Sequence, residues 1–284
     1  MKTLIDQLYS AEEIYRPPLE RNSALLEVTQ GCSYGKCFFC DFGRDTFFQF
    51  PLEEIRSKIQ ILGLVIGDNP RLFLTGCNPF CLQTDTLLQI LHWIHHDLPL
   101  VNSVSMYARA EDINKKSKQE LKLLAQMGIT DLHVGLESGS AEVLHLHNKG
   151  ETPEQIRQAL DMLTNCGMYY HVTVIPGMGG RRLSDTHARH TADLLSCLQP
   201  LSIWCTALKI WPGTPLAHMA KNGQFQPLTP EEILREERTM LERIQLKNDC
   251  IYADSTVLNQ YTIVTKLPDG KEASLQKMQI LLER

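Results

Sequence analysis

The chain has 284 residues, of which 43% are apolar and 21% charged, a balance typical of a globular protein with a sizeable core. Its 28 basic and 33 acidic side chains are interspersed and give a net charge of −5, so we expect no nucleic-acid partner. No apolar run is long enough to span a bilayer, and the N-terminal segment lacks the apolar centre of a signal peptide. We therefore expect a cytoplasmic protein without a membrane partner, in which clustered cysteines bind metal more often than they form disulfides.

Six strand-like runs follow one another along the first three quarters of the chain. Several are apolar at almost every position, which is typical of strands that are covered on both faces of a parallel sheet. The predicted strands span residues 23–30, 71–76, 102–108, 131–137, 169–177 and 202–210.

Helix-like segments separate these strands. The ranges 117–120 and 152–155 have the spacing of capping boxes, and apolar periodicity predicts further helices at 50–62, 84–94 and 184–198. Alternating strands and helices predict an α/β fold with a parallel sheet and right-handed crossovers. Because about 190 residues are too few for a closed barrel of eight units, we favour a partial, TIM-like (βα)6 barrel. A doubly wound open sheet is the alternative.

The remainder of the chain predicts a mainly helical C-terminal extension. A capping box at 229–232 opens a long charged helix that we expect to reach about residue 247, where the charged pattern ends. A strand and turn at 261–270 and a last helix at 271–283 follow. We therefore divide the chain into a core with an N-terminal lead-in, residues 1–215, and an extension that packs on it, residues 216–284.

Three cysteines stand close together in the loop after the first predicted strand. Cys32, Cys37 and Cys40 have the spacing C-x4-C-x2-C, at the sheet edge where βα proteins assemble active sites. A structural zinc site takes four protein ligands, whereas three thiolates on a [4Fe–4S] cluster leave one iron open for a small molecule. Unrelated buried cysteines, or half of a zinc site completed from afar, are the alternatives.

The segment GCSYGKCFFC resembles the cluster loop of the radical S-adenosylmethionine (radical SAM) enzymes. Its spacing is one residue longer than the commonest family spacing, C-x3-C-x2-C, and the resemblance extends over residues 22–215. It implies that Cys32, Cys37 and Cys40 ligate three irons of a [4Fe–4S] cluster while SAM chelates the fourth. It further implies reductive cleavage of SAM, a 5′-deoxyadenosyl radical, and hydrogen abstraction from a substrate. An electron donor such as flavodoxin or ferredoxin is then required.

The resemblance also implies SAM contacts near the first two strands. Phe39, just before the third cysteine, takes the position of a residue that lies against the adenine. Thr75, Gly76 and Asn78 end the second strand, where family members offer backbone oxygens to the ammonium group of SAM. Packing within the loop is the alternative for Phe39.

Later strand ends supply the other implied SAM contacts. Arg109 could clamp the carboxylate of SAM with its two-pronged guanidinium, or form a surface salt bridge. Glu137 and Ser138 take the position of the ribose or methionine contact, although Glu137 could serve only as a residue at a helix terminus. Ile175 and Gly177 lie in a glycine-rich segment whose family counterpart packs on the adenine; an ordinary loop is the alternative.

Other cysteines and histidines have no place in this scheme. Cys77 and Cys81 lie near the same edge, and we expect them to be spectator thiols unless Cys205 or Cys250 joins them around a second metal. His187 and the nearby His190 share a helical face without an evident carboxylate partner, so we expect a surface or capping role.

Three functions remain open at this point. The first is a radical SAM enzyme acting on an unidentified substrate, which we expect to be a small molecule. The second is a haem- or metal-binding protein on the same scaffold without radical chemistry, in which His187, His190 or the spare cysteines would be axial ligands. Structural zinc is a third possibility.

Overall fold

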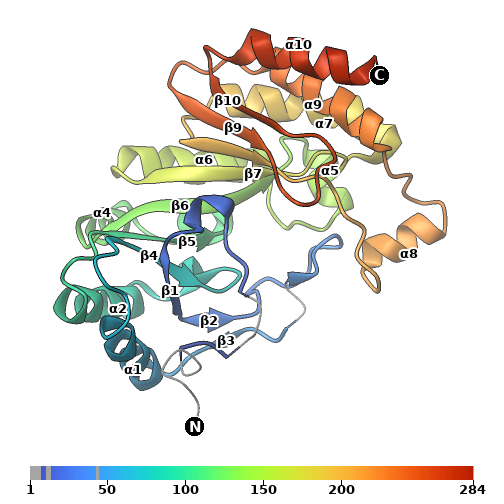
Figure 1. The fold of residues 1–284 in the computed structure, drawn as a ribbon. Helices are drawn as coiled ribbons and strands as arrows, with labels where there is room; N and C mark the ends of the chain where they lie inside the picture. Colours follow the sequence, from blue (N-terminus) through green and yellow to red (C-terminus); the bar gives the residue numbers. More distant parts are fainter. Residues whose placement is uncertain (1–7, 11–13, 43–44, 284) are drawn as a thin grey trace. The chain divides into compact units, whose positions relative to one another are not determined.

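The structure is a computed structural model that describes residues 8–10, 14–42 and 45–283 (Figure 1). The predicted N-terminal lead-in therefore lies partly outside the described residues. The strands are β1 (Ala24–Glu27), β2 (Thr29–Gln30), β3 (Phe48–Gln49), β4 (Arg71–Thr75), β5 (Ser103–Ala108), β6 (Ile129–Glu137), β7 (Tyr169–Val174), β8 (Ser202–Cys205), β9 (Cys250–Asp254) and β10 (Ile263–Leu267). The helices are α1 (Leu52–Gly63), α2 (Thr84–Asp97), α3 (Ala110–Asn114), α4 (Lys118–Gln126), α5 (Ala141–Leu146), α6 (Pro153–Asn165), α7 (Gly180–Ser196), α8 (Pro215–Lys221), α9 (Pro230–Arg243) and α10 (Lys271–Leu282), with 3₁₀ turns η2 (Pro18–Glu20) and η4 (Pro79–Cys81).

The main sheet has the strand order β1-β4-β5-β6-β7-β8-β9-β10, and β2 pairs with β3 in a separate antiparallel ladder. The pairs β1–β4, β4–β5, β7–β8 and β8–β9 are parallel, and β9–β10 is antiparallel. Successive βα strands are neighbours in the sheet, as in a (βα) barrel, whereas a doubly wound sheet reverses its order near the middle. The predicted α/β fold with a partial (βα)6 arrangement is thus confirmed.

The chain divides into two compact units. The first comprises the described residues up to 35, together with 42–133 and 162–169. Within it α1 packs on β1, α2 packs on α1, and α4 packs on α2. The strand side chains Leu26, Phe73 and Leu74 are fully buried, as are Ile55 of α1 and Leu87 of α2. Strands that are apolar at almost every position therefore form the centre of this unit.

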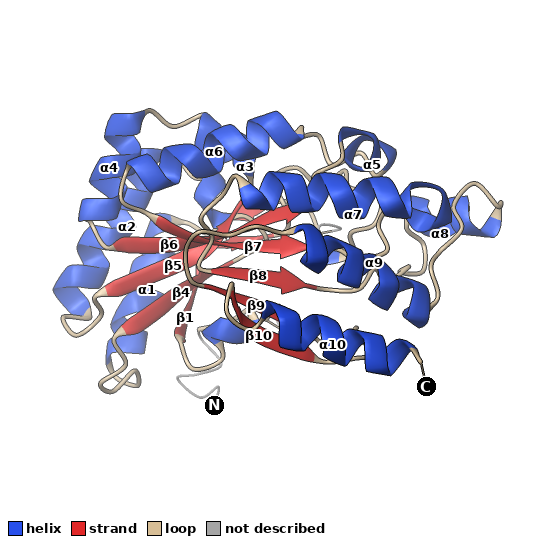
Figure 2. Cartoon of the chain, turned by 90° about the horizontal axis from the view of Figure 1, so that it is seen from above, coloured by secondary structure: helices blue, strands red, loops and turns tan. Residues whose placement is uncertain are grey.

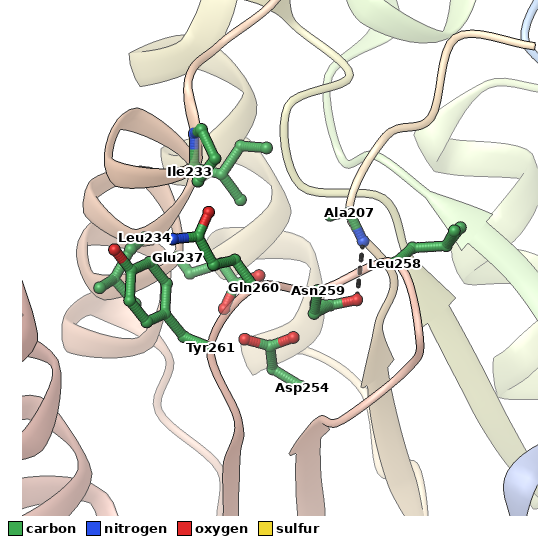
Figure 3. A pocket seen from close by; sticks show the side chains of 10 residues that line it. Ala207, Ile233, Leu234, Glu237, Asp254, Leu258, Asn259, Gln260 and Tyr261 are labelled. Atoms are coloured by element: carbon green, nitrogen blue, oxygen red, sulfur yellow. Dashed lines mark hydrogen bonds between the residues drawn. The ribbon is translucent and has the colours of Figure 1, made fainter.

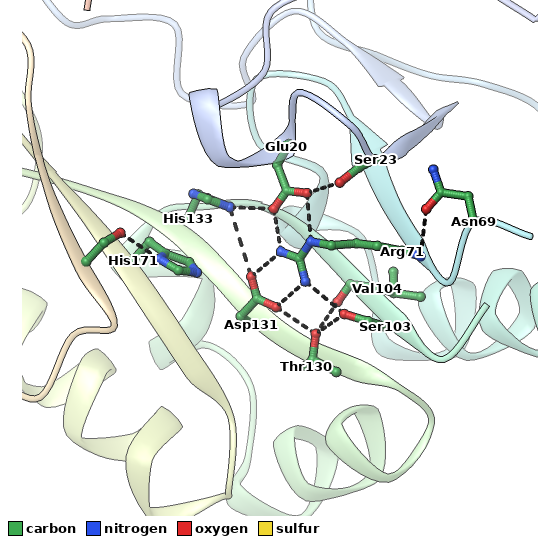
Figure 4. A network of polar contacts seen from close by, with 11 residues as sticks. Glu20, Ser23, Asn69, Arg71, Ser103, Val104, Thr130, Asp131, His133 and His171 are labelled. Atoms are coloured by element: carbon green, nitrogen blue, oxygen red, sulfur yellow. Dashed lines mark hydrogen bonds and ion pairs between the residues drawn. The ribbon is translucent and has the colours of Figure 1, made fainter. Parts of the chain in front are cut away.

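A polar network closes the end of this unit where β4 and β5 begin (Figure 4). Arg71 opens β4, Ser103 opens β5, and Asp131 lies early in β6. The guanidinium of Arg71 donates to Ser103, Asp131 and Glu20 of η2, and the Glu20 carboxylate also meets His133. The carboxyl ends of β4 and β5, which carry predicted site residues, lie at the opposite end of these strands.

The second unit comprises residues 36–41, 134–161 and the described residues from 170 onward. The helix α9 lies between α7 and α10, and α10 packs on β10 (Figure 2). Sequence analysis did not predict β9, which pairs on one side with β8 and on the other with β10. The C-terminal extension thus contributes two strands as well as its helices, and its predicted boundary at residue 216 stays a prediction.

Helix starts agree with the sequence. Ser117 and Thr229 each accept a hydrogen bond from the backbone N–H three residues later, and the glutamate there caps back in both boxes. Thr152 and Gln155 exchange the same pair of bonds. The helix α9 ends at Arg243, four residues before the expected end, because Ile244 adopts an extended backbone (φ −56°, ψ 131°). No helix in the described part of the chain is long and apolar enough to cross a membrane.

Candidate functional site

The three clustered cysteines lie on the segment that connects β2 to β3. All three are half-buried. Cys32 belongs to the first compact unit, and Cys37 and Cys40 belong to the second. The backbone N–H of Cys40 donates to the carbonyl of Cys37 over 3.4 Å, so these two thiols are carried on one turn. Three half-buried thiols on one loop suit metal ligation better than packing in a core.

Asn78 anchors the first part of this loop within the first unit. Its Nδ2 donates to Ser33 Oγ and to Asp112 Oδ2, each over 2.7 Å, and its Oδ1 accepts the N–H of Arg109 over 3.2 Å. Asn78 is fully buried, and Ser33 is the residue next to Cys32. The predicted SAM-contacting Asn78 therefore ties the cysteine loop to the ends of β4 and β5.

Arg109 reinforces the same part of the loop. The Arg109 side chain is buried, and its guanidinium carbon lies 4.1 Å from the centre of the Tyr34 ring. Glu111 approaches the guanidinium to 4.0 Å. The guanidinium is buried and stacked on an aromatic residue of the cysteine loop, and its ion pair with Glu111 keeps the salt-bridge alternative. A contact of Arg109 with a carboxylate stays a prediction.

Thr75 and Gly76 complete the predicted residues at the end of β4. Thr75 is paired with Glu27 of β1 and is buried. Gly76 has φ +135°, and a Cβ there would lie 2.0 Å from Thr29 Oγ1. The requirement for glycine thus has a cause within the protein, the close approach of the backbone to Thr29, independent of any ligand.

Residues 147 and 148 anchor the second part of the loop within the second unit. The carbonyl of His147 accepts the N–H of Phe38 over 2.9 Å, and Asn148 Nδ2 donates to the carbonyl of Lys36 over 2.9 Å. The N–H of Leu216 donates to the carbonyl of Phe38 over 3.1 Å. Sequence analysis did not predict this role. Asn148 has φ +49°, a conformation that asparagine tolerates better than most residues.

Phe39 and Ile175, both predicted to lie against adenine, pack on the same apolar cluster of Val143, Met178 and Leu183. The structure therefore brings these two predicted residues together although 136 positions separate them in the chain. Both are half-buried, so the cluster leaves part of each side chain accessible. Apolar and aromatic surface of this kind suits a flat heterocycle.

His147 borders this cluster. Its ring centroid lies 5.8 Å from that of Phe39 in an edge-to-face arrangement, and its Nε2 donates to the carbonyl of Met178 over 2.7 Å. Burial lowers the pKa of His147 to about 4, so the ring is neutral at physiological pH. Its Nδ1 is buried and has no hydrogen-bond partner among the described residues.

Glu137 ends β6 with a left-handed backbone, φ +62°. Its Oε1 lies 3.3 Å from Lys149 Nζ, which also lies 3.6 Å from Glu151 Oε2. A Cβ on Gly135 would lie 2.2 Å from Glu137 Oε1, so the glycine makes room for the carboxylate. A strained backbone held by a buried ion pair is a pattern that clusters at functional sites.

Ser138 is fully buried, and its Oγ lies 2.8 Å from Nδ1 of His187. The expectation of a surface role for His187 is wrong, because this side chain is only 1% exposed. It also has a carboxylate neighbour that sequence analysis missed: Glu236 Oε1 lies 3.6 Å from His187 Nε2. Burial lowers the pKa of His187 to about 4, so it is neutral at physiological pH.

Glu236 of α9 connects this helix to the turn at Gly177 and to the start of α7. Its Oε1 accepts the N–H of Gly177 over 2.6 Å, and its other oxygen accepts the Ser184 hydroxyl. Burial raises the pKa of Glu236 to about 7, although both hydrogen bonds lower it. Gly177 has φ +87°, so glycine suits this turn.

Three of the remaining cysteines, Cys81, Cys205 and Cys250, have raised pKa values and are therefore protonated at physiological pH. Burial raises the pKa of Cys81 to about 11 and that of Cys250 to about 12, and it also raises the pKa of Cys205 well above its usual range. Cys77 Sγ donates to the carbonyl of Phe42 over 3.3 Å. Protonated thiols are poor metal ligands, which agrees with spectator roles.

Comparison with known proteins identifies a family and several relatives. The family model of the radical SAM superfamily matches residues 26–195. The chain is 21% identical over 265 residues to the tRNA uridine(34) acetyltransferase of Methanocaldococcus infernus, covering 74% of this chain and 47% of that protein. It is 20% identical over 244 residues to the haem chaperone HemW of Bacillus subtilis, covering 84% of this chain and 62% of that protein. The chain thus spans about half to three fifths of the length of these relatives.

A solved structure shares the fold. The radical SAM methyltransferase TsrM from Kitasatospora setae, solved with cobalamin and a [4Fe–4S] cluster bound, superposes with a TM-score of 0.58 at 19% identity. The match covers 70% of this chain and 37% of that protein.

Proposed function

Because the chain belongs to the radical SAM superfamily, we propose that it is an enzyme that binds a [4Fe–4S] cluster and SAM and abstracts hydrogen from a substrate. The single observation that carries this proposal is the loop of three half-buried cysteines, spaced C-x4-C-x2-C, within the matched residues. Membership of the family supports the two cofactors. The relatives do not indicate the substrate of this chain.

The donor set fits a cluster that keeps one iron for a small molecule. Cys32, Cys37 and Cys40 would hold three irons, and the loop that carries them is fixed by hydrogen bonds to Asn78 in one unit and to His147 in the other. When bound, the cluster supplies the electron that cleaves the carbon–sulfur bond of SAM. The protein's own task is to position SAM and substrate and to exclude water and oxygen.

Each predicted SAM contact has a role in this proposal. Phe39 and Ile175 would offer an apolar surface to the adenine, because they pack on one cluster. Glu137 would accept hydrogen bonds from ribose hydroxyls, with its carboxylate oriented by Lys149. Ser138 would position this turn through its contact with His187. Gly177 would hold the loop after β7 through Glu236.

The remaining contacts concern the amino-acid part of SAM. Thr75, Gly76 and Asn78 would place strand-edge backbone oxygens near its ammonium group, and Arg109 would pair with its carboxylate. We further propose a small-molecule substrate, an electron donor such as flavodoxin or ferredoxin, and a cytoplasmic location, where a reducing environment protects an exposed cluster.

Anaerobic reconstitution tests the enzyme directly. The purified chain should take up four irons per protein, as expected for a [4Fe–4S] cluster, and should form 5′-deoxyadenosine when SAM and dithionite are added. Replacing Cys32, Cys37 or Cys40 by alanine should abolish both. Cys197→Ala is the matched control, because Cys197 is an exposed cysteine outside the loop. An intact cluster in any of the three loop variants would contradict the assignment.

The relative named as a haem chaperone favours one alternative, a protein that binds haem on this scaffold. His187 does not suit an axial ligand, because it is buried and held by Ser138. Haem titration followed by its Soret band distinguishes the two functions. Stable stoichiometric haem binding without any 5′-deoxyadenosine would favour the alternative.

A further inference from the structure

A small cavity in the second unit is lined by two buried carboxylates (Figure 3). It has a volume of about 50 Å³, which by the usual requirement of a buried water is room for about three water molecules. Glu237 of α9 and Asp254, the last residue of β9, point toward one another in it. Glu237 is 1% exposed and Asp254 is 3% exposed.

These carboxylates lack donors. Apart from a proton within the pair itself, no N–H or O–H group of the described residues donates to either oxygen of Glu237 or to Oδ1 of Asp254. A buried acceptor without a donor costs free energy, and the cost is larger when the acceptor is charged. The lining contains two amides, Asn259 and Gln260, and neither donates to these oxygens. Asn259 accepts from Ala207 and Thr256 and donates to the carbonyl of Cys205.

One proton is shared within the pair. Burial raises the pKa of Glu237 well above its usual range, the negative charge of Asp254 raises it further, and burial raises the pKa of Asp254 to about 7. Two carboxyls at contact cannot both ionise, so the pair carries a single negative charge. The basic residues nearest along α9 do not neutralise it: Arg235 is exposed, and Arg238 lies 3.5 Å from Glu242.

The walls of the cavity identify the kind of cation. Besides the carboxylates, most of the lining is apolar, and it is contributed by Ala207, Pro230, Ile233, Leu234, Leu258 and Tyr261. A hydrated metal ion prefers oxygen ligands and its own water shell, which apolar walls cannot replace. An alkylammonium ion instead supplies three N–H donors to the carboxylates and buries its carbon chain against the walls.

We propose that this cavity is a binding site for the primary ammonium group of a small organic amine, held by Glu237 and Asp254. The single charge of the pair matches a monovalent cation, and the ammonium group provides the missing donors. Ala207 follows β8 and Asp254 ends β9, so the site lies at the carboxyl ends of these parallel strands. The site uses no cysteine of the loop and stands whether or not the proposed radical chemistry is correct.

Titration of the full-length chain with n-propylammonium chloride tests the site. Isothermal calorimetry at neutral pH and constant ionic strength should give saturable binding, and neutral n-propanol should not compete. The variant Glu237→Gln/Asp254→Asn removes the charge while its two amides can hydrogen-bond to one another. It should weaken binding at least about tenfold.

The matched control is Glu231→Gln/Glu242→Gln, which removes the same number of carboxylates from exposed positions of α9 and should bind as the parent does. If the buried double variant does not fold, competition in the parent chain decides: potassium and magnesium chloride should fail to displace propylammonium. Displacement by either ion would overturn the proposal in favour of an inorganic cation. If propylammonium binding does not saturate up to about 100 mM, the proposal is wrong and the two carboxyls only share a proton in the core.

Discussion

Arg71 donates two parallel hydrogen bonds to Asp131, from Nη1 to Oδ1 over 2.9 Å and from Nη2 to Oδ2 over 2.7 Å. The other side of the same guanidinium binds Glu20, whose carboxylate also lies 2.9 Å from His133 Nε2. One arginine therefore compensates two buried carboxylates and ties η2 to β4 and β6 within the first unit. This bidentate geometry is the strongest that an arginine makes with a carboxylate.

Replacing Arg71 by methionine should destabilise the chain by about 3–5 kcal/mol, because Glu20 and Asp131 are left buried without their counter-ion. Urea unfolding followed by circular dichroism measures the loss. Arg157→Met is the matched control: its pair with Glu154 is exposed and screened by solvent, so its loss should leave stability nearly unchanged. Equal losses in the two variants would show that the network contributes little.

Replacing Asn78 by alanine should loosen the cysteine loop. Three groups lose their partner, Ser33 Oγ, Asp112 Oδ2 and the N–H of Arg109, at a cost of about 1–3 kcal/mol. If the loop holds a cluster, a chelator should also remove iron from the reconstituted variant several times faster. Asn102→Ala, at an exposed asparagine, should leave both stability and iron release unchanged. Unaltered iron release from Asn78→Ala would show that Asn78 does not help the loop to hold a cluster.

Gly135→Ala should displace the Glu137 carboxylate. The added methyl group would lie 2.2 Å from Glu137 Oε1, so the side chain must leave its position beside Lys149. If Glu137 contacts SAM, this variant and Glu137→Gln should both raise the KM for SAM by about tenfold or more, as the loss of a buried charge-assisted hydrogen bond implies. The rate of 5′-deoxyadenosine formation at varied SAM concentration measures it. A normal KM in both variants would exclude Glu137 from SAM binding.

Glu236→Gln should change how stability depends on pH. The folded-state pKa of Glu236 is raised to about 7 from the ordinary 4.5, so its protonated form is favoured in the folded chain. That contribution is complete below pH 4.5 and is lost as the pH rises toward 7. Glutamine keeps an acceptor for Gly177 and cannot ionise. The variant should therefore gain stability relative to the parent as the pH rises, by up to about 3 kcal/mol.

Urea unfolding of parent and variant at several pH values between about 5 and 8 checks this difference, with His187 present in both. Glu231→Gln, an exposed acid of the same helix, is the control for a change of charge alone. A difference that shrinks with rising pH has the wrong sign for a buried acid of raised pKa.

Local patterns predicted much of the fold. The capping boxes at Ser117, Thr152 and Thr229 are confirmed because both partners of each box lie within one helical turn. The predicted βα strands are confirmed with shifted ends; the strand expected to reach residue 210 stops at Cys205. The strand β9 was missed because its five residues have no distinctive pattern and depend on pairing with β8 and β10.

Part of the candidate site could likewise be predicted from the sequence, and part could not. The spacing of Cys32, Cys37 and Cys40 is a property of one short segment, so the sequence alone indicated the cluster and, through the family, the class of chemistry. Only the tertiary structure showed that His187 is buried beside Glu236, 49 positions away, and that Glu237 faces Asp254. Burial, and with it every shifted pKa, depends on helices and strands that meet after folding, because desolvation is set by neighbours in space and not along the chain.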